Sequence, residues 1–185
     1  MKILGTILTD NLSWDENCDE ITSKINKRMR LLKKLHNFGA TKEEMVHFWI
    51  MYCRSVLEQS SVVWSSSLTQ ENIEDLERTQ KSFVKLILKN EYREDSDDSY
   101  EESLMKLNLE TLEVRRNHLD LNFAKNCMEH DKFKDLFLQN EKLHLMETRH
   151  HEEFQVFHAN TERLKKSSII HMQNLLNNET KKMAK

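Results

Sequence analysis

Proline is absent from this chain of 185 residues, and glycine occurs only twice. Both residues interrupt helices, proline because it lacks a backbone N–H and glycine because of its conformational freedom. Their scarcity favours long helices and excludes a glycine-rich phosphate-binding loop. The composition therefore predicts an all-α fold.

Cysteine is also scarce, with three widely separated residues and no CxxC pair: Cys18, Cys53 and Cys127. An odd, scattered set is typical of reduced thiols inside a cell. No apolar run approaches the roughly 18–20 residues that span a bilayer, and the first residues lack the pattern of a signal peptide. We expect an intracellular protein, in the cytoplasm or nucleus, without a targeting signal and without contact with a membrane.

Charged residues make up 32% of the chain, and they gather in blocks although the net charge is only -3. Residues 20–36 and 161–185 are rich in Lys and Arg, whereas residues 91–102 are rich in Asp and Glu. Such blocks indicate basic surfaces separated by an acidic loop.

Strand-like alternation is clearest at residues 1–12, which we expect to be a strand or hairpin remnant with an exposed apolar side. Residues 13–90 should form a three-helix bundle, because apolar residues recur there at spacings of three and four. Helix-start signals stand before each helix: Ser13 with Glu16, Thr41 with Glu44, and Thr69. The expected inward residues are Ile21, Ile25, Met29, Leu32, His36, Met45, Phe48, Trp49, Tyr52, Val56, Ile73, Leu76, Gln80, Phe83, Val84, Ile87 and Leu88.

Four further segments are expected. Residues 91–99 form an acidic loop, residues 100–138 a helical extension, residues 139–160 a flexible arm, and residues 161–185 a C-terminal amphipathic helix and tail. Helices should start at Ser99 with Glu102 and at Thr161. The expected inward residues are Leu112, Leu119, Phe123, Ala124, Cys127, Leu164, Ile169, Met172, Leu175 and Leu176.

The first helix carries the main candidate site, a row of cations. At about 100° per residue, Lys27, Arg30, Lys33 and Lys34 lie opposite the apolar stripe, and Lys24 and Arg28 flank it. A row of cations matches the phosphates of a nucleic acid, because binding releases condensed counterions. The alternative is a solvated helix face without a ligand.

The aromatic residues, the cysteine and histidine residues and the clustered carboxylates each have a plainer interpretation than a functional site. Four aromatic residues could stack on bases, but their helical spacing favours core packing: Phe48, Trp49, Tyr52 and Trp64. A zinc site needs four converging ligands, and no compact zinc-finger spacing joins Cys127, His130, His144, His150 and His151. Polymerase chemistry needs carboxylates that hold two metal ions, whereas the clustered carboxylates lie in a polar loop: Asp95, Asp97 and Asp98. We expect no catalytic residue, no metal and no cofactor.

Ordered motifs along nearly the whole chain resemble the C-terminal, post-palm part of non-LTR (LINE-type, jockey-like) retrotransposon reverse transcriptases. The motifs are Leu4-Gly5-Thr6-Ile7-Leu8, Leu12-Ser13-Trp14, Arg54-Ser55-Val56-Leu57-Glu58, Val63-Trp64-Ser65, Leu76-Glu77-Arg78-Thr79-Gln80-Lys81, Asn90-Glu91-Tyr92, Leu109-Glu110-Thr111-Leu112-Glu113-Val114-Arg115-Arg116, Phe123-Ala124-Lys125 and Thr161-Glu162-Arg163-Leu164-Lys165-Lys166-Ser167. Family members tend to have proline near Val63, Phe137 and Ile170, and this chain has none. Loss at three places suggests drift in a decaying genomic copy.

The resemblance implies a thumb-like helical bundle followed by a helical tail. The family's metal-binding palm motif precedes the matching region, so no catalytic residue carries over to this chain. The basic helix would contact the backbone of an RNA or DNA duplex without reading its sequence. The alternatives are a helical protein-interaction module and a degenerate retroelement product with no molecular role. The apolar residues 1–12 could also support self-association.

Overall fold

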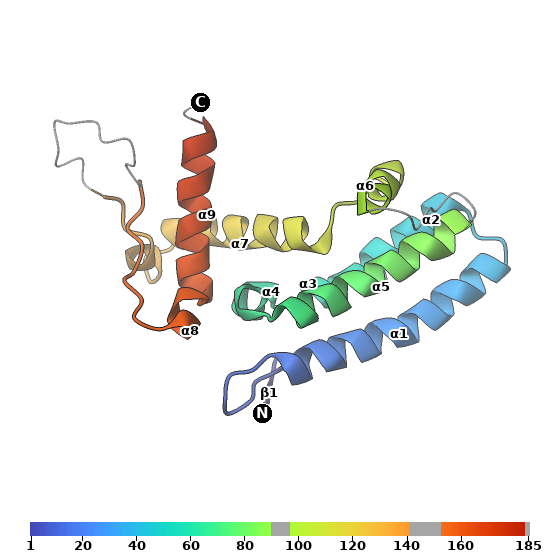
Figure 1. The fold of residues 1–185 in the computed structure, drawn as a ribbon, viewed down its shortest axis with the longest axis horizontal. Coiled ribbons are helices and arrows are strands. Elements are labelled where there is room, and N and C mark those ends of the chain that lie inside the picture. The colour runs from blue at the N-terminus through green and yellow to red at the C-terminus, as the bar shows by residue number, and fades with distance from the viewer. Residues whose placement is uncertain (90–96, 141–152, 184–185) are drawn as a thin grey trace. The chain divides into compact units, whose positions relative to one another are not determined.

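The computed structural model describes residues 1–89, 97–140 and 153–183. This part of the chain is mainly helical, with one two-stranded hairpin, which confirms the predicted all-α class (Figure 1). None of the helices described is long and apolar enough to cross a bilayer. The chain divides into two compact units, Met1–Ser61 with Leu68–Arg115 and Val62–Ser67 with Arg116–Lys185.

The first unit opens with the predicted hairpin, whose strands are β1 (Lys2–Ile3) and β2 (Thr6–Ile7). The strands are antiparallel and joined by a tight turn. Two side chains fasten the hairpin to the helices. The Ile7 amide donates to Asn17 Oδ1 at 3.0 Å, and Gln59 Nε2 donates to a carbonyl of the turn at 3.0 Å.

Three helical segments form the predicted bundle of the first unit. They are α1 (Asp15–Asn37), then α2 (Lys42–Phe48) continued by the π-helix η1 (Trp49–Arg54) and α3 (Ser55–Glu58), then α5 (Gln70–Leu88). In Figure 1 α1 and α5 run in the same direction, and the middle segment returns between their ends. α1 packs against α5 and against all three parts of the middle segment. The apolar stripe predicted for the first helix is confirmed for Ile21, Ile25, Met29 and Leu32, which are buried, whereas its last predicted member, His36, is half-buried.

The helix starts of the bundle follow the predicted caps in two of three cases. At Thr41 the capping box is complete: the Glu44 amide donates to Thr41 Oγ1 at 3.2 Å, and the Thr41 amide donates to Glu44 Oε2 at 2.8 Å. Thr69 also caps its helix. The capping box predicted at Ser13 is wrong, because α1 begins after Trp14 without a side-chain cap. The Ser13 hydroxyl instead donates to a carboxylate two residues further on.

α6 (Asp97–Lys106) packs against α5 and completes the first unit with the start of α7 (Leu112–Glu129). The predicted start of this helix at Ser99 is wrong, because α6 begins two residues earlier and Ser99 is inside it. Residues 97–99 of the expected loop 91–99 are therefore helical. The rest of that loop lies outside the described residues.

A side chain of α5 caps the N-terminus of α7. The amide of Leu112 donates to Glu77 Oε2 at 3.1 Å, and the Tyr100 hydroxyl donates to Glu77 Oε1. Gln80, fully buried in α5, donates to the carbonyl of Glu110 at 2.8 Å and to the Tyr100 hydroxyl at 3.2 Å. The Thr111 hydroxyl also accepts from the Val114 amide at 3.3 Å, so the free amides at this helix start find acceptors both in the preceding residue and on α5.

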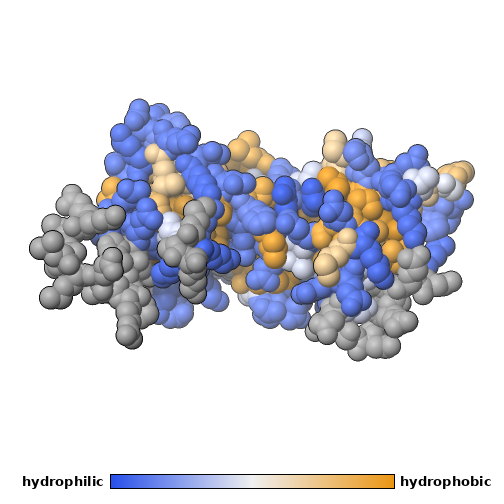
Figure 2. Space-filling model, turned by 90° about the horizontal axis from the view of Figure 1, so that it is seen from above, coloured by the Kyte–Doolittle hydropathy of each residue, from blue (hydrophilic) through white to orange (hydrophobic). Residues whose placement is uncertain are grey.

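Large apolar side chains also reach the surface, between hydrophilic ones, as Figure 2 shows for one face of the molecule. On the hairpin, Ile3 is 49% exposed and Leu4 is 89% exposed, which agrees with the apolar side expected there. On the middle segment of the bundle, Met51 and Tyr52 are exposed.

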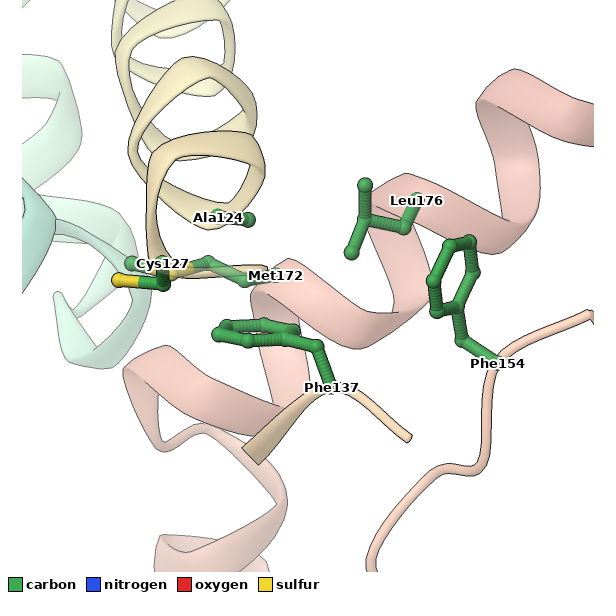
Figure 3. Close-up of a cluster of buried hydrophobic side chains, with 6 residues drawn as sticks. All are labelled: Ala124, Cys127, Phe137, Phe154, Met172 and Leu176. Carbon is green, nitrogen blue, oxygen red and sulfur yellow. The ribbon is translucent and has the colours of Figure 1, made fainter. Parts of the chain in front are cut away.

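In the second unit, α7 meets α9 (Ser168–Met183), the 3-10 turn η4 (Lys134–Leu136) and a short segment that contains η2 (Ser65–Ser67). Figure 3 shows the apolar cluster that forms between α7, α9, the residue that follows η4 and the segment that contains Phe154. Its buried members are Ala124, Cys127, Phe137, Phe154, Met172 and Leu176.

The buried face of α7 differs from the predicted one. Phe123, expected inside, is 45% exposed, whereas Arg116 and Asp120 are buried. Stepping from Arg116 through Asp120 to Ala124 gives a spacing of four, so one face of the helix is buried and partly polar. Hydrophobic periodicity alone could not find it, because two of its members are charged.

The start of the C-terminal helix is confirmed at Thr161, whose hydroxyl accepts from the Leu164 amide at 3.2 Å. The helix is broken, however, into α8 (Glu162–Lys165) and α9, separated by two residues. Leu164 was expected on the apolar face, and that expectation is wrong because it is 47% exposed.

Residues 153–157, within the expected arm 139–160, run alongside α9. Gln139 and Phe154 form an antiparallel bridge. Asn177 accepts from the Phe154 amide at 2.8 Å and donates to the Phe154 carbonyl at 3.0 Å. One turn earlier on α9, Gln173 accepts from the Phe157 amide at 3.0 Å. Residues 141–152 lie outside the described residues.

Candidate nucleic-acid interface

The candidate interface is the solvent side of α1. Its four predicted central cations, Lys27, Arg30, Lys33 and Lys34, are all exposed, opposite the buried apolar stripe. No ion pair or side-chain hydrogen bond joins them to any residue within 1–89, 97–140 or 153–183. Four cations therefore lie on one helix face with their charge uncompensated by the described residues.

Lys24 and Arg28, predicted as flanking members of the row, are half-buried and have local electrostatic roles. Lys24 Nζ lies 3.3 Å from Glu20 Oε1, and Lys2 Nζ donates to the same oxygen at 3.2 Å. These two hydrogen bonds lower the pKa of the Glu20 carboxyl. Lys24 therefore has less free charge for a ligand than the four exposed cations.

Arg28 is a half-buried residue of α1, which packs against η1, the part of the middle segment that contains Cys53. Burial raises the pKa of the Cys53 thiol to about 11, and the positive charge of Arg28 acts in the opposite direction. Arg28 is therefore less open to a ligand than the four exposed cations.

The length of the row suits a nucleic-acid backbone. The ten residue steps from Lys24 to Lys34 rise about 15 Å along a helix, and duplex DNA has one charge per about 1.7 Å of its axis. Several phosphates would therefore fall within reach at once. The alternative, a solvated helix face without a ligand, also has support. Acidic residues in the first turn of α1 and Lys34 in its last turn complement the helix dipole and so stabilise the helix without a ligand.

The aromatic residues behave in two ways. Trp49 and Trp64 are fully buried, as predicted, and the Trp49 ring stacks on Phe83 at a centroid distance of 4.4 Å. Core packing was wrongly expected for Tyr52, which is 58% exposed, while Phe48 is half-buried. The π-helix between Trp49 and Arg54 widens the turn, so a spacing of 3.6 residues misplaces Tyr52.

The histidine and carboxylate clusters gain no supporting geometry. Cys127 is buried and His130 is exposed. Four other candidate residues lie outside the described residues: Asp95, His144, His150 and His151. Among the residues that are described, no group of three or more His, Cys, Asp or Glu side chains could hold a metal ion.

A buried polar cluster in the second unit was not predicted. Asp120 Oδ2 accepts from the Ser65 hydroxyl at 3.1 Å and lies 3.5 Å from His171 Nε2, which is 3.2 Å from Asn117 Oδ1. Burial raises the pKa of Asp120 to about 6 and lowers that of His171. Ser65 bonds to the carboxylate and not to the imidazole, so these residues lack the hydrogen-bond order of a catalytic triad.

The described residues thus define a helical protein whose main candidate site is an electrostatic surface on α1. No protein-family model, curated protein or solved structure matches the chain.

Proposed function

We propose that this chain is a thumb-like nucleic-acid-binding module derived from a non-LTR retrotransposon reverse transcriptase. α1 would contact the phosphates of an RNA or DNA duplex without sequence preference. The observation that carries the proposal is the exposed row Lys27, Arg30, Lys33 and Lys34, which forms no ion pair with the part of the chain that the structure describes. The order of sequence motifs along the chain gives independent support for the retroelement origin.

The proposed module carries no polymerase chemistry of its own. In the family the metal-binding carboxylates precede the region that this chain resembles, so the module would serve a catalytic part supplied elsewhere. We place it inside the cell, where its three buried cysteines would remain reduced. Template-dependent primer extension by the purified chain, abolished by changing one of its carboxylates, would contradict this part of the proposal.

Binding of a fluorescein-labelled duplex, followed by anisotropy across a salt series, tests the role of α1. Three or four phosphate contacts should give a slope of log K against log salt of roughly -3 to -4. Between about 50 and 200 mM salt the affinity should then fall roughly 60- to 250-fold. We expect dissociation constants in the micromolar range or weaker, because the net charge of -3 opposes binding.

The decisive variant changes Lys27, Arg30, Lys33 and Lys34 to Gln, which should flatten the salt slope without loss of helicity. A matched control removes four other exposed cations that also lack a side-chain ion pair with the described residues: Lys89, Lys106, Lys132 and Lys166. Both variants lose the same total charge, so a difference between their affinities for the duplex would come from the position of the cations on α1. Equal weakening by the two variants, or binding insensitive to salt, would rule out α1 as the interface.

A second proposal concerns the hairpin and self-association. Ile3 is 49% and Leu4 89% exposed on a two-stranded sheet. The outer edges of a two-stranded sheet present unpaired backbone groups, and exposed apolar side chains beside them favour association between copies. This proposal is independent of nucleic-acid binding, and its test is the deletion of residues 1–11 described in the Discussion.

A further inference from the structure

Serine hydroxyls join two distant parts of the chain within the second unit. Ser168, the first residue of α9, donates to the carbonyl of Val63 at 2.9 Å. In the other direction, Ser66 and Ser67 donate to the carbonyl of Lys166 at 2.9 Å and 2.7 Å. Three hydroxyls therefore fasten the segment that contains η2 to the start of α9.

The sequence around Ser168 differs from that around every other serine and threonine of the chain. Lysine stands both two and three positions earlier, at Lys166 and Lys165, and no other serine or threonine has a Lys or Arg at both of these positions. An apolar residue, Ile169, follows directly. Paired cations before a serine and an apolar residue after it match the substrate groove of basophilic protein kinases, which is lined with carboxylates.

The cations before Ser168 are open to solvent. Arg163, Lys165 and Lys166 are all exposed, and two residues that belong to neither helix separate α8 from α9. Lys165 pairs with Glu162 at 2.6 Å, but the two side chains remain 55% and 80% exposed, and such a surface pair opens at little cost. Ser168 is half-buried at a helix end, where local opening costs less free energy than in the core.

We infer that Ser168 is a phosphorylation site for a basophilic protein kinase, and that the phosphate releases residues 62–67 from α9. The inference rests on the intracellular location proposed above and not on nucleic-acid binding. In the reaction, Ser168 Oγ attacks the γ-phosphorus of ATP and forms a new O–P bond. The bond from the γ-phosphorus to the β,γ-bridging oxygen breaks, ADP leaves, and the hydroxyl proton passes to a carboxylate of the kinase.

A phosphate on Ser168 would replace an attraction to Val63 by a repulsion. The modified Oγ has no hydrogen to donate, and the phosphate brings about 1.5 to 2 negative charges close to a carbonyl oxygen. α9 itself should tolerate the group, because negative charge at the N-terminus of a helix is favourable. Phosphorylation should therefore loosen residues 62–67 and leave α9 folded.

Phosphorylation of the full chain by the catalytic subunit of cAMP-dependent protein kinase, with magnesium and ATP, tests the assignment. Tandem mass spectrometry should locate the phosphate on Ser168 of the wild-type chain. Ser168→Ala should abolish its incorporation. Ser167→Ala is the matched control and should keep it, because Ser167 has Leu164 in place of a cation three positions earlier.

Charge variants test the recognition pattern. Lys165→Gln combined with Lys166→Gln should lower kcat/KM roughly tenfold or more, since loss of a charge-assisted hydrogen bond costs about that factor. Lys181→Gln combined with Lys182→Gln removes the same charge from exposed positions elsewhere on α9 and should leave kcat/KM unchanged. Equal losses in the two double variants would overturn the role of the paired lysines.

Hydrogen exchange of the phosphorylated and unmodified chains tests the release. Amides of residues 62–67 should exchange faster after phosphorylation, whereas those of α9 beyond its first turn should not. Equal exchange in the two states would overturn the release. Phosphate on another residue, or none on a chain that circular dichroism shows to be helical, would overturn the site. Duplex binding by α1 is measured on the unmodified chain, so either proposal can fail without the other.

Discussion

Replacement of Asp120 by Asn should stabilise the second unit at neutral pH. The pKa of Asp120 is raised from 3.8 to about 6 by burial, although Ser65 and Arg116 act to lower it. The folded state therefore holds the proton more tightly than the unfolded state. The stabilising contribution of this proton is complete below pH 4 and is lost as the pH rises through about 6.

The size of the effect follows from linkage. A shift of about 2 pKa units corresponds to at most about 3 kcal/mol of differential stability between the two protonation states. An Asn at this position never ionises, so the variant should avoid this cost above pH 7. At roughly 2–4 °C per kcal/mol for a chain of this size, Tm should rise by up to about 10 °C at pH 7.5. At about pH 3, below both pKa values, the two proteins should melt together.

Differential scanning calorimetry at both pH values measures this difference. His171 shifts in the opposite sense, since burial lowers its pKa, and its contribution to stability is lost as the pH falls. It is present in both proteins and cancels to first order. Asp131→Asn is the control, because the Asp131 side chain is 96% exposed and loses the same charge. A Tm that falls in Asp120→Asn at pH 7.5, or a difference that does not depend on pH, would refute the reasoning.

Two other perturbations test features of each unit. Asn177→Ala removes both hydrogen bonds to the Phe154 backbone and leaves buried polar groups unpaired, so the free energy of unfolding in urea should fall by about 2–4 kcal/mol. Asn178→Ala, on the exposed side of α9, is the control and should change this free energy little. Equal effects of the two changes would contradict the anchoring role of Asn177. Deletion of residues 1–11 should reduce association measured by light scattering, because it removes the exposed Ile3 and Leu4. Unchanged or greater association after the deletion would show that copies of the chain do not associate through the hairpin.

Much of the first unit could be predicted because its signals are local. A capping box needs residues three apart, as at Thr41 and Glu44, and an apolar stripe needs a constant helical period. The first condition holds at the start of α2 and the second in α1 and α5, and the exposed side of α1 follows from its stripe. The same rule failed for Tyr52, because a π-helix changes the number of residues per turn. No residue type in the sequence marks where a π-helix will form.

The second unit was harder to predict because its determinants are distant in sequence. Asp120 is buried with Ser65 and near His171, each more than 50 positions away. Phe154 is anchored by Asn177, which lies 23 positions further on. A pattern read along one helix contains no information about such partners, so polar residues that are buried through them look like surface residues.

The anchoring of residues 153–157 also bears on how this region can change through evolution. α9 binds the backbone of the segment, through Asn177 and Gln173, and only Phe154 contributes a side chain to the apolar cluster. Substitutions at Gln155 would leave these amide contacts intact, with one exception. Proline there, or at Phe154 or Phe157, would delete an N–H that donates to Leu138, Asn177 or Gln173 respectively. The segment can therefore drift widely in sequence and keep its place, provided that the chain remains as free of proline as it is now.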